Sequence, residues 1–540
     1  MHRKTLLATV AAFALGGLAA CGGGGDAPPP APQPVAVGDT VALTASGRIV
    51  SFNRATPATL VGAVSVTGLA SGETLLGIDI RPADGLLYAL GSAGNIYTIV
   101  PSTGAATLRV ALRAAAGDDN PYAALVGDSF AVDFNPAADR LRVIGNLGQN
   151  LRINVATGDT ITDGLIAPAA GGTATVSAGA YTNSFAGTTT TQLFDLDVVA
   201  GTLHLQDPPN NGTLAAGLPL GVTATAANGF DIDARNNTGY AALTVGGTTS
   251  LYTVNLTTGA ATAVAGGAIA GGEAIRGLAL VQPAAPTAIG LTADNRLLAF
   301  NPAAPNTITS TTTITGLQTG EVILGIDVRP GNGLLYALAT GGRLYTVDPA
   351  TGAATFRVAL AADPADATAP YSGLASNALS VDFNPAADRL RVIADNGQSL
   401  RINVDTGLTT TDGDINRVGV APSVLAAAYA NSFAGTTTTV LYDLEAASNV
   451  LAIQNPPNNG TLVDVGALGL DIAGSGGFDI AGGGNGLALA ALRVGTTGPM
   501  SLYAVNLTTG AATFYRGLAA DAAQIGGAGG VPLVDLAIRF

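Results

Sequence analysis

Three aspartates occupy the same place in three short apolar segments of the chain, and this spacing suggests shared chemistry. They are Asp79 in GIDI, Asp133 in AVDF and Asp231 in GFDI. The pattern returns 248 or 249 residues later with Asp327, Asp382 and Asp479. If such segments lie around one axis, three carboxylates converge in each set. A hard cation such as Ca²⁺ takes several oxygen ligands, so both sets are candidate Ca²⁺-type metal sites.

The same aspartates allow two other interpretations. Each is flanked by apolar residues, which predicts burial, and a buried carboxylate needs a partner. An Asp–Arg bond between neighbouring segments would fix their register, and we expect this structural arrangement. The available arginines are Arg81, Arg140, Arg142, Arg329, Arg389 and Arg391. Paired carboxylates can also hydrolyse glycosides, but only at a defined separation.

Little else in the chain favours catalysis. Beyond His2 the only histidine is His204, and its matching position in the second half is Ala452. Cys21 is the only cysteine. These counts exclude a Ser-His-Asp triad in the second half and zinc sites rich in His or Cys. We expect His204 to be an ordinary strand residue and the protein not to be an enzyme.

Residues 1–20 have the features of a secretory signal, with a basic start, an apolar run and small residues before Cys21. The ending LAAC resembles the lipobox of bacterial lipoproteins, which implies cleavage before Cys21 and lipid attachment to it. The Gly-rich and then Pro-rich segment 21–35 predicts a tether. Gly22 stands where an inner-membrane retention signal usually has Asp, so the same resemblance implies the outer membrane. We therefore expect an exported, membrane-anchored chain.

The body of the chain is acidic and rich in apolar and small residues. The formal net charge is −14, 48% of residues are hydrophobic, and 73 are glycine. Acidity argues against nucleic acid as a partner, because a phosphate backbone needs a basic face. The apolar content is ample for packed cores, which must be stable without internal disulfides. We expect a monomer.

A long exact repeat organises the body. VDFNPAADRLRVI occurs at 132–144 and again at 381–393. NSFAGTTTT and PPNNGTL also occur twice, at nearly the same offset. The chain is therefore a tandem duplication of a unit of roughly 250 residues. We place the two copies at 36–285 and 286–540.

Within each copy, alternating apolar runs and Gly-containing turns predict short antiparallel strands. Residues 75–112 are the clearest unit, with four strands separated by the turns ADG, AGN and STGA. Four such strands form one β-propeller blade, and we count five units in each copy. The first unit lacks its opening strand. Spare strands at 274–281 and 533–540 would complete it and close a ring.

These features predict an all-β protein made of two tandem five-bladed β-propellers. The linker 282–286 is as short as the turns within a blade, so one ten-bladed ring is an alternative. The first strand of each blade lies nearest the axis, where the three aspartates of each copy would converge. In the fourth unit the alignment places Tyr181 or Tyr429 at this position, and in the closing strand Ala279 or Ala537.

Several repeated motifs together carry a family resemblance. GIDIRP, VDFNPAADRLRVI, NSFAGTTTT and GFDI resemble the uncharacterised bacterial family called domain of unknown function 4394, over both copies. The resemblance implies a secreted and often lipid-anchored protein. It supplies no activity and no catalytic residues.

The longest irregular segments, 113–129 and 362–380, lie between the second and third units of each copy. Each carries acidic residues and a Pro-Tyr pair, so Tyr122 and Tyr371 are candidates for ligand-binding loops. We expect a non-catalytic binding or interaction module of the cell envelope, with a protein or glycan ligand. The alternatives are an enzyme acting on an extracellular glycan or similar polymer, and a structural spacer.

Overall fold

The computed structural model describes residues 33–281, 285–419, 421–482 and 487–540. The expected signal, the lipidation site Cys21 and most of the tether lie outside the described residues. The described residues form ten β-sheets, most of them with four strands. Among these residues, no helix has the length and apolar character needed to cross a membrane.

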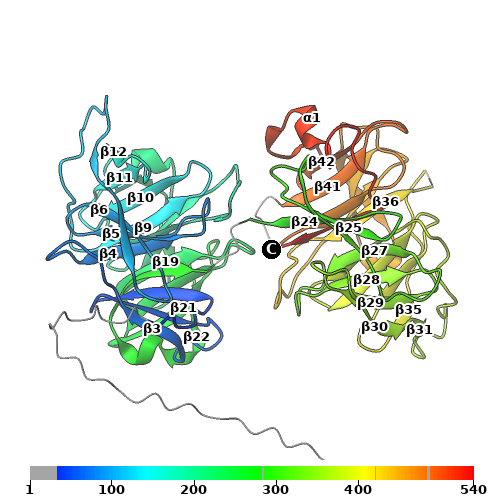
Figure 1. Ribbon diagram of the computed structural model, residues 1–540, viewed down its shortest axis with the longest axis horizontal. Helices are drawn as coiled ribbons and strands as arrows, with labels where there is room; N and C mark the ends of the chain where they lie inside the picture. The colour runs from blue at the N-terminus through cyan, green and yellow to red at the C-terminus, as the bar shows by residue number, and fades with distance from the viewer. Residues whose placement is uncertain (1–32, 282–284, 420, 483–486) are drawn as a thin grey trace, which may run out of the picture. The chain divides into compact units, whose positions relative to one another are not determined.

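Five sheets are the blades of one ring, called ring 1, whose strands run from blue to green in Figure 1. Within a blade, consecutive strands pair antiparallel from the innermost strand outward. Blade 1 contains β23 (Ile275–Leu280), β1 (Thr40–Thr44), β2 (Arg48–Phe52) and β3 (Leu60–Ser65). Blade 2 contains β4 (Leu75–Ile80), β5 (Leu87–Gly91), β6 (Asn95–Ile99) and β7 (Ala106–Ala111).

The other three blades of ring 1 follow the same plan with short additions. Blade 3 contains β9 (Phe130–Asn135), β10 (Arg140–Gly145), β11 (Asn150–Ile153), β12 (Asp159–Thr162) and, parallel to β12, β8 (Arg113–Ala114). Blade 4 contains β14 (Val176–Tyr181), β15 (Leu193–Asp197), β16 (Thr202–Gln206), β17 (Thr213–Leu214), β13 (Ala167–Pro168) and β18 (Leu218–Pro219). Blade 5 contains β19 (Ala224–Ile232), β20 (Gly239–Val245), β21 (Thr248–Val254) and β22 (Ala261–Ala268).

Ring 1 closes on itself. Strand β23, from the end of the first copy, pairs with β1 from its start, with Ala279 opposite Val41. The innermost strands contact one another in the cyclic order β4, β9, β14, β19, β23 and back to β4. This closure covers the edge of β1 that would otherwise be unpaired. The predicted five-bladed ring is confirmed, and a single ten-bladed ring is excluded.

The second copy builds ring 2 from the remaining strands, green to red in Figure 1. Blade 1 contains β44 (Asp535–Arg539), β24 (Thr287–Leu291), β25 (Arg296–Phe300) and β26 (Ile308–Thr313). Blade 2 contains β27 (Ile323–Val328), β28 (Leu335–Ala339), β29 (Arg343–Val347) and β30 (Ala354–Ala359). Blade 3 contains β32 (Leu379–Asn384), β33 (Arg389–Ala394), β34 (Ser399–Ile402), β35 (Leu408–Thr411) and β31 (Ala361–Ala362).

Blade 4 of ring 2 contains β36 (Val424–Tyr429), β37 (Leu441–Glu445), β38 (Val450–Gln454) and β39 (Leu462–Ala467). Blade 5 contains β40 (Gly477–Ile480), β41 (Ala488–Arg493), β42 (Met500–Val505) and β43 (Ala512–Phe514). Strand β44 pairs with β24 and closes this ring as β23 closes ring 1. The described helical turns are η1 (Pro209–Asn211), η2 (Ile269–Gly272), η3 (Pro457–Asn459), η4 (Tyr515–Gly517) and α1 (Ala520–Ala523).

The hydrophobic core lies mainly between successive blades. Tyr88 of blade 2 packs edge-on against Phe134 of blade 3, with ring centroids 5.2 Å apart. Tyr336 and Phe383 repeat this contact at the same distance in ring 2. Strand β5 is buried throughout, and β4 and β6 are mostly buried, whereas the outer strand β7 is half-buried or exposed. Packing on both faces of a blade explains why its strands are nearly continuous apolar runs.

Candidate functional site

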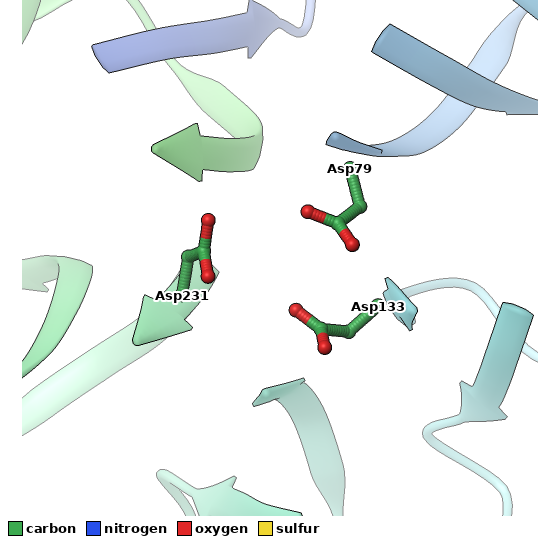
Figure 2. Close-up of side chains that lie close together, drawn as sticks. All are labelled: Asp79, Asp133 and Asp231. Carbon is green, nitrogen blue, oxygen red and sulfur yellow. The ribbon is translucent and has the colours of Figure 1, made fainter. Parts of the chain in front are cut away.

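The predicted aspartates of each ring meet at its axis. One carboxylate oxygen from each of Asp79, Asp133 and Asp231 lies within 4.8 Å of the others. Figure 2 shows these three side chains pointing toward a common centre from different strands, which are β4, β9 and β19. Asp327, Asp382 and Asp479 form the matching group in ring 2. All six residues are only 2–4% exposed.

Backbone N–H groups bind these carboxylates. Asp79 accepts the N–H of Phe134, on the next blade, through Oδ2 at 2.7 Å. Its Oδ1 accepts the N–H of the following residue, Ile80, at 2.7 Å. Asp133 accepts the N–H of Tyr181, again on the next blade, at 3.0 Å. Each of these aspartates therefore joins its own inner strand to the neighbouring one.

Asp231 completes the set. It accepts the N–H of Leu280 on β23 and the N–H of Ile232 on its own strand, both at 2.6 Å. Five of the six carboxylate oxygens thus accept one N–H group each. The five N–H groups come from the five inner strands, one from each strand. We call this arrangement the girdle. Ring 2 repeats it, with bonds from Val328 and Phe383 to Asp327, from Tyr429 to Asp382 and from Ile538 to Asp479.

The girdle has a physical reason in the geometry of a propeller. The inner strand of each blade is paired on one side only, so its other side presents unpaired N–H groups to the axis. A buried N–H without an acceptor costs about 1–3 kcal/mol. A short side chain at the axis that accepts two such groups removes this cost and links two blades. The axial aspartates are therefore part of ring closure.

The prediction that arginines bind the axial aspartates is wrong. Arg81 does reach the next blade, but its Nε binds Asp139 at 2.8 Å and its Nη1 binds Asp84. Buried Arg142 binds Asp163 at 2.6 Å. Backbone N–H groups already bind the axial carboxylates, and these arginines form their ion pairs with other acids. The other arginines also bind groups outside the girdle. Arg140 and Arg389 donate to the carbonyl oxygens of the residues before them, and Arg329 and Arg391 bind the carboxylates of Asp388 and Asp412.

The alignment of blade 4 was wrong by one residue. Asp79 stands opposite Tyr88 on β5, and the residue in the same place on β14 is Ala180, not Tyr181. Strand β14 has its β-bulge at the same place as β4, so Gly77 corresponds to Ala178, and matching Gly77 to Gly179 causes the error. Ala428 takes the place of Tyr429 likewise. Blade 4 therefore contributes no side-chain oxygen to the girdle.

Burial makes a negative charge on the girdle carboxylates costly. Burial, and next the charge of a neighbouring aspartate, raise the pKa of Asp79 and Asp133 well above the usual range. Burial raises the pKa of Asp231 and of Asp479 to about 7, although N–H bonds oppose it. Each girdle therefore favours protons on its carboxyls near neutral pH, whereas a bound cation would favour the charged forms.

Each ring also contains a buried carboxyl outside the girdle that was not predicted from the sequence. Asp195 and Asp443 lie on the second strand of blade 4, fully buried, and no described group hydrogen-bonds to either oxygen of either residue. Burial raises the pKa of both to about 8, opposed only by Arg142 and Arg391. The signal was an acid inside an apolar strand, LFDLD and LYDLE.

Ring 2 carries one further axial acid. Asp535 accepts the N–H groups of Ile326 and Leu536, both at 2.9 Å. In ring 1 the same position is Gly277, because Leu43 faces Gly277 as Leu291 faces Asp535. A cavity of about 10 Å³ beside Gly277 in ring 1 has room for about one water molecule. The two axes therefore differ next to otherwise identical girdles.

His204 has a structural environment. One ring nitrogen lies 2.8 Å from the hydroxyl of Thr202, and the other lies 2.8 Å from the carbonyl oxygen of Ala215. The side chain is buried, on β16. Both nitrogens are occupied by groups of the same blade, which suits the strand role expected for this residue.

The two tyrosines predicted to bind a ligand pack against the hydrophobic core of their rings. Tyr122 is half-buried and packs against the core cluster that contains Tyr88 and Phe130. Its hydroxyl oxygen would lie 3.0 Å from a Cβ at Gly94, in the β5–β6 turn. Tyr371 occupies the same place over Gly342 in ring 2. Each tyrosine anchors its long segment to the ring, and a role in binding stays a prediction.

An open groove of about 750 Å³ lies between blades 4 and 5 of ring 1. It is formed where the β14–β15, β19–β20 and β21–β22 connections meet. None of its lining side chains carries a charge. The lining residues are Thr182, Gln192, Phe194, Asn236, Asn237, Thr238, Thr253, Val254, Asn255, Leu256, Thr257, Thr258, Ala260 and Thr262. No sequence motif marks this groove, because its residues come from three separate turns and the strands beside them.

The family model "Domain of unknown function (DUF4394)" matches residues 48–279 and again residues 296–527. The chain belongs to this family. Each match falls within one ring, so one ring corresponds to one copy of the domain. The family description assigns no activity, and no curated protein matches the chain.

Solved structures that resemble the chain share little sequence with it. The Dos1 propeller is 13% identical with a TM-score of 0.25, over 67% of this chain and 90% of that one. BamB from Moraxella catarrhalis is 12% identical with a TM-score of 0.19, over 76% and 90%. The extracellular domain of a hybrid two-component system from B. thetaiotaomicron is 11% identical with a TM-score of 0.27, over 88% and 59%. Scores this low carry no argument about function.

Proposed function

We propose that this protein is a non-catalytic binding module of the bacterial cell envelope, exported and held at the outer membrane by lipid on Cys21. The observation that carries the non-catalytic part is the girdle. Five of its six oxygens accept backbone N–H groups in ring 1, for example those of Phe134 and Leu280. Carboxylates that hold the blades together are poorly placed to exchange protons with a substrate.

The surroundings of these carboxylates do not suit the enzyme alternative. Glycoside hydrolysis needs one carboxyl on each side of the scissile bond, with room for the sugar between them. Asp79, Asp133 and Asp231 are almost completely buried and converge within 4.8 Å. A rigid ring with connections free to vary at its rim instead suits binding.

The anchoring part of the proposal rests on the sequence of the N-terminus. Cys21 is the only cysteine, and it follows a basic start and an apolar run at the position where a lipobox places its cysteine. Replacing Cys21 with Ser removes the lipid attachment point. We expect this variant to leave the membrane fraction of the producing cell, whereas the parent chain stays in it. A parent chain found free of membranes contradicts the anchor.

Binding and catalysis can be separated on purified envelopes. We expect labelled full chain in mild detergent to bind envelope preparations saturably and to release no soluble product from them. The Asp133→Asn variant should bind equally well if it folds. Product release that disappears in a folded Asp133→Asn variant would establish the enzyme alternative. Absence of saturable binding would favour a structural spacer.

A further inference from the structure

We propose that the groove between blades 4 and 5 of ring 1 binds a neutral, hydroxyl-rich ligand, a segment of a glycan. This assignment rests on the proposed function and names the site and ligand class for it. The groove, at about 750 Å³, lies within the range of about 300–1,000 Å³ typical of small-molecule sites. It is open, so a chain longer than the groove can extend beyond its ends.

The chemistry of the lining selects the ligand class. Amides and hydroxyls both donate and accept hydrogen bonds, as sugar hydroxyls do, and the groove offers Gln192, Asn236 and several threonines. None of its lining residues is Lys or Arg, and the chain carries a net charge of −14. An anionic ligand would therefore meet no countercharge in the groove and would be repelled by the rest of the surface.

The polar groups are held in place by the fold. Oδ1 of Asn255 accepts the N–H groups of Thr257 and Thr258 at 2.9 and 3.0 Å, which fixes the β21–β22 turn. Asn237 is held by Asn183 through two bonds, at 2.9 and 2.8 Å. Because these side chains are already ordered, they lose little conformational entropy when a ligand binds.

Ring 2 shows that the fold does not need this polarity. Thr182 donates its N–H to the carbonyl of Gln192, and Ala430 donates to Val440 at the same distance of 2.9 Å. The backbone is thus equivalent while the exposed amide is replaced by an apolar side chain. Thr253 lies on β21 of ring 1, where it pairs with the outer strand of blade 5. The residue in the same place on β42 of ring 2 is Ala504. Groups that the fold can omit are free to serve binding.

The matching residues give a matched pair of variants. Gln192→Val with Thr253→Ala gives the ring 1 groove the side chains of ring 2 at these two positions. Val440→Gln with Ala504→Thr makes the reverse change in ring 2 and serves as the control. All four positions are surface or half-buried, so we expect both double variants to melt within a few degrees of the parent chain.

The experiment titrates full chain in mild detergent with cellohexaose, maltohexaose and chitohexaose as neutral probes, and with hexagalacturonate as the acidic probe. Isothermal titration calorimetry measures the affinity. We expect at least one neutral probe to bind at one site per chain. The ring 1 double variant should bind it at least tenfold more weakly, and the ring 2 double variant should bind it as the parent does.

Four outcomes overturn the assignment. These are no binding of any neutral probe, tighter binding of the acidic probe, two sites per chain, or unchanged binding by the ring 1 double variant. The envelope experiment decides the proposed function separately. If envelopes are bound saturably while the groove result fails, the groove assignment is wrong and the binding module stands. If envelopes are not bound either, both are wrong.

Discussion

The two rings of this protein have the same girdle around their axes and differ at their rims. Both carry three aspartates that accept N–H groups from the inner strands, with nearly the same partners and distances. The groove residues Gln192 and Thr253 of ring 1 are replaced by Val440 and Ala504 in ring 2. After a duplication, residues that hold the ring together stay, whereas surface residues diverge. The difference therefore separates architecture from candidate function within one chain.

The largest effect should come from removing a closing strand. A chain ending at residue 281 keeps β23 and its pairing with β1, so we expect it to fold and to unfold cooperatively. A chain ending at residue 273 lacks β23, which opens the ring and leaves the Asp231 carboxylate without the Leu280 N–H. Calorimetry should show a transition for the first chain and none for the second. If neither chain folds, the rings are not independent units.

The next effect comes from the girdle itself. Asp79→Ala leaves the buried N–H of Phe134 and the partly buried N–H of Ile80 without an acceptor, and Asp133→Ala leaves only the buried N–H of Tyr181. At about 1–3 kcal/mol for each buried group, Asp79→Ala should lose more free energy of unfolding than Asp133→Ala, up to about twice as much. Denaturant titration measures both, and Asp327→Ala and Asp382→Ala should repeat the order in ring 2. Equal losses, or the reverse order, would show that these bonds do not set the cost.

The unpartnered carboxyls predict an unusual dependence on pH. Burial raises the folded-state pKa of Asp195 and Asp443 to about 8, above the ordinary value of 3.8. A raised folded-state pKa means stability that is complete below about pH 4 and is lost as the pH rises to about 8. We therefore expect the melting temperature to fall from pH 5 to pH 9.

Replacing both residues tests the source of this loss. Asp195→Asn with Asp443→Asn should gain on the order of a few kcal/mol in each ring at pH 9 and less at pH 5, because a tenfold change in an acidity constant corresponds to about 1.4 kcal/mol. The melting temperature at pH 9 should therefore rise by several degrees. Part of the slope should remain, because the axial Asp231 and Asp479 titrate at about 7. A melting temperature that is independent of pH in the parent chain would rule out buried, protonated carboxyls.

The smallest effect concerns the groove residues in the absence of ligand. Gln192→Val and Val440→Gln exchange the residues of the two rings at surface positions with equivalent backbone bonds. Each should change the free energy of unfolding by less than about 0.5 kcal/mol. A clearly larger loss for Gln192→Val would mean that the amide supports the fold, and the contrast between the rims would then have a structural cause.

Much of the architecture could be predicted from the sequence, because local residue patterns indicate the strands and turns. Alternating apolar runs with Gly-containing turns indicated the blades, and the spare strand at 274–281 indicated closure. The repeated VDFNPAADRLRVI indicated shared structure, and its residues have structural roles. Asp133 belongs to the girdle, Asn135 accepts N–H groups of the following turn, and Arg142 binds Asp163.

The partners of the axial aspartates could not be predicted, because backbone N–H groups leave no trace in a sequence. Arginine was the only visible cation, and the structure shows that Arg81 and Arg142 bind other acids. The alignment of blade 4 was misplaced by one residue because β14 has its glycine, Gly179, one position later than β4 has Gly77. The groove joins residues from three turns that are distant in sequence, so no local motif marks it.

The central claim is that the axial carboxylates bind the inner strands and that ligand binding occurs elsewhere. Thermal unfolding of the full chain in EDTA and in millimolar Ca²⁺ tests it most directly, because a ligand that binds only the folded state raises the melting temperature. We predict the same melting temperature in both. A rise of several degrees with Ca²⁺ that is absent in Asp79→Asn and Asp327→Asn would contradict the claim and make each girdle a metal site.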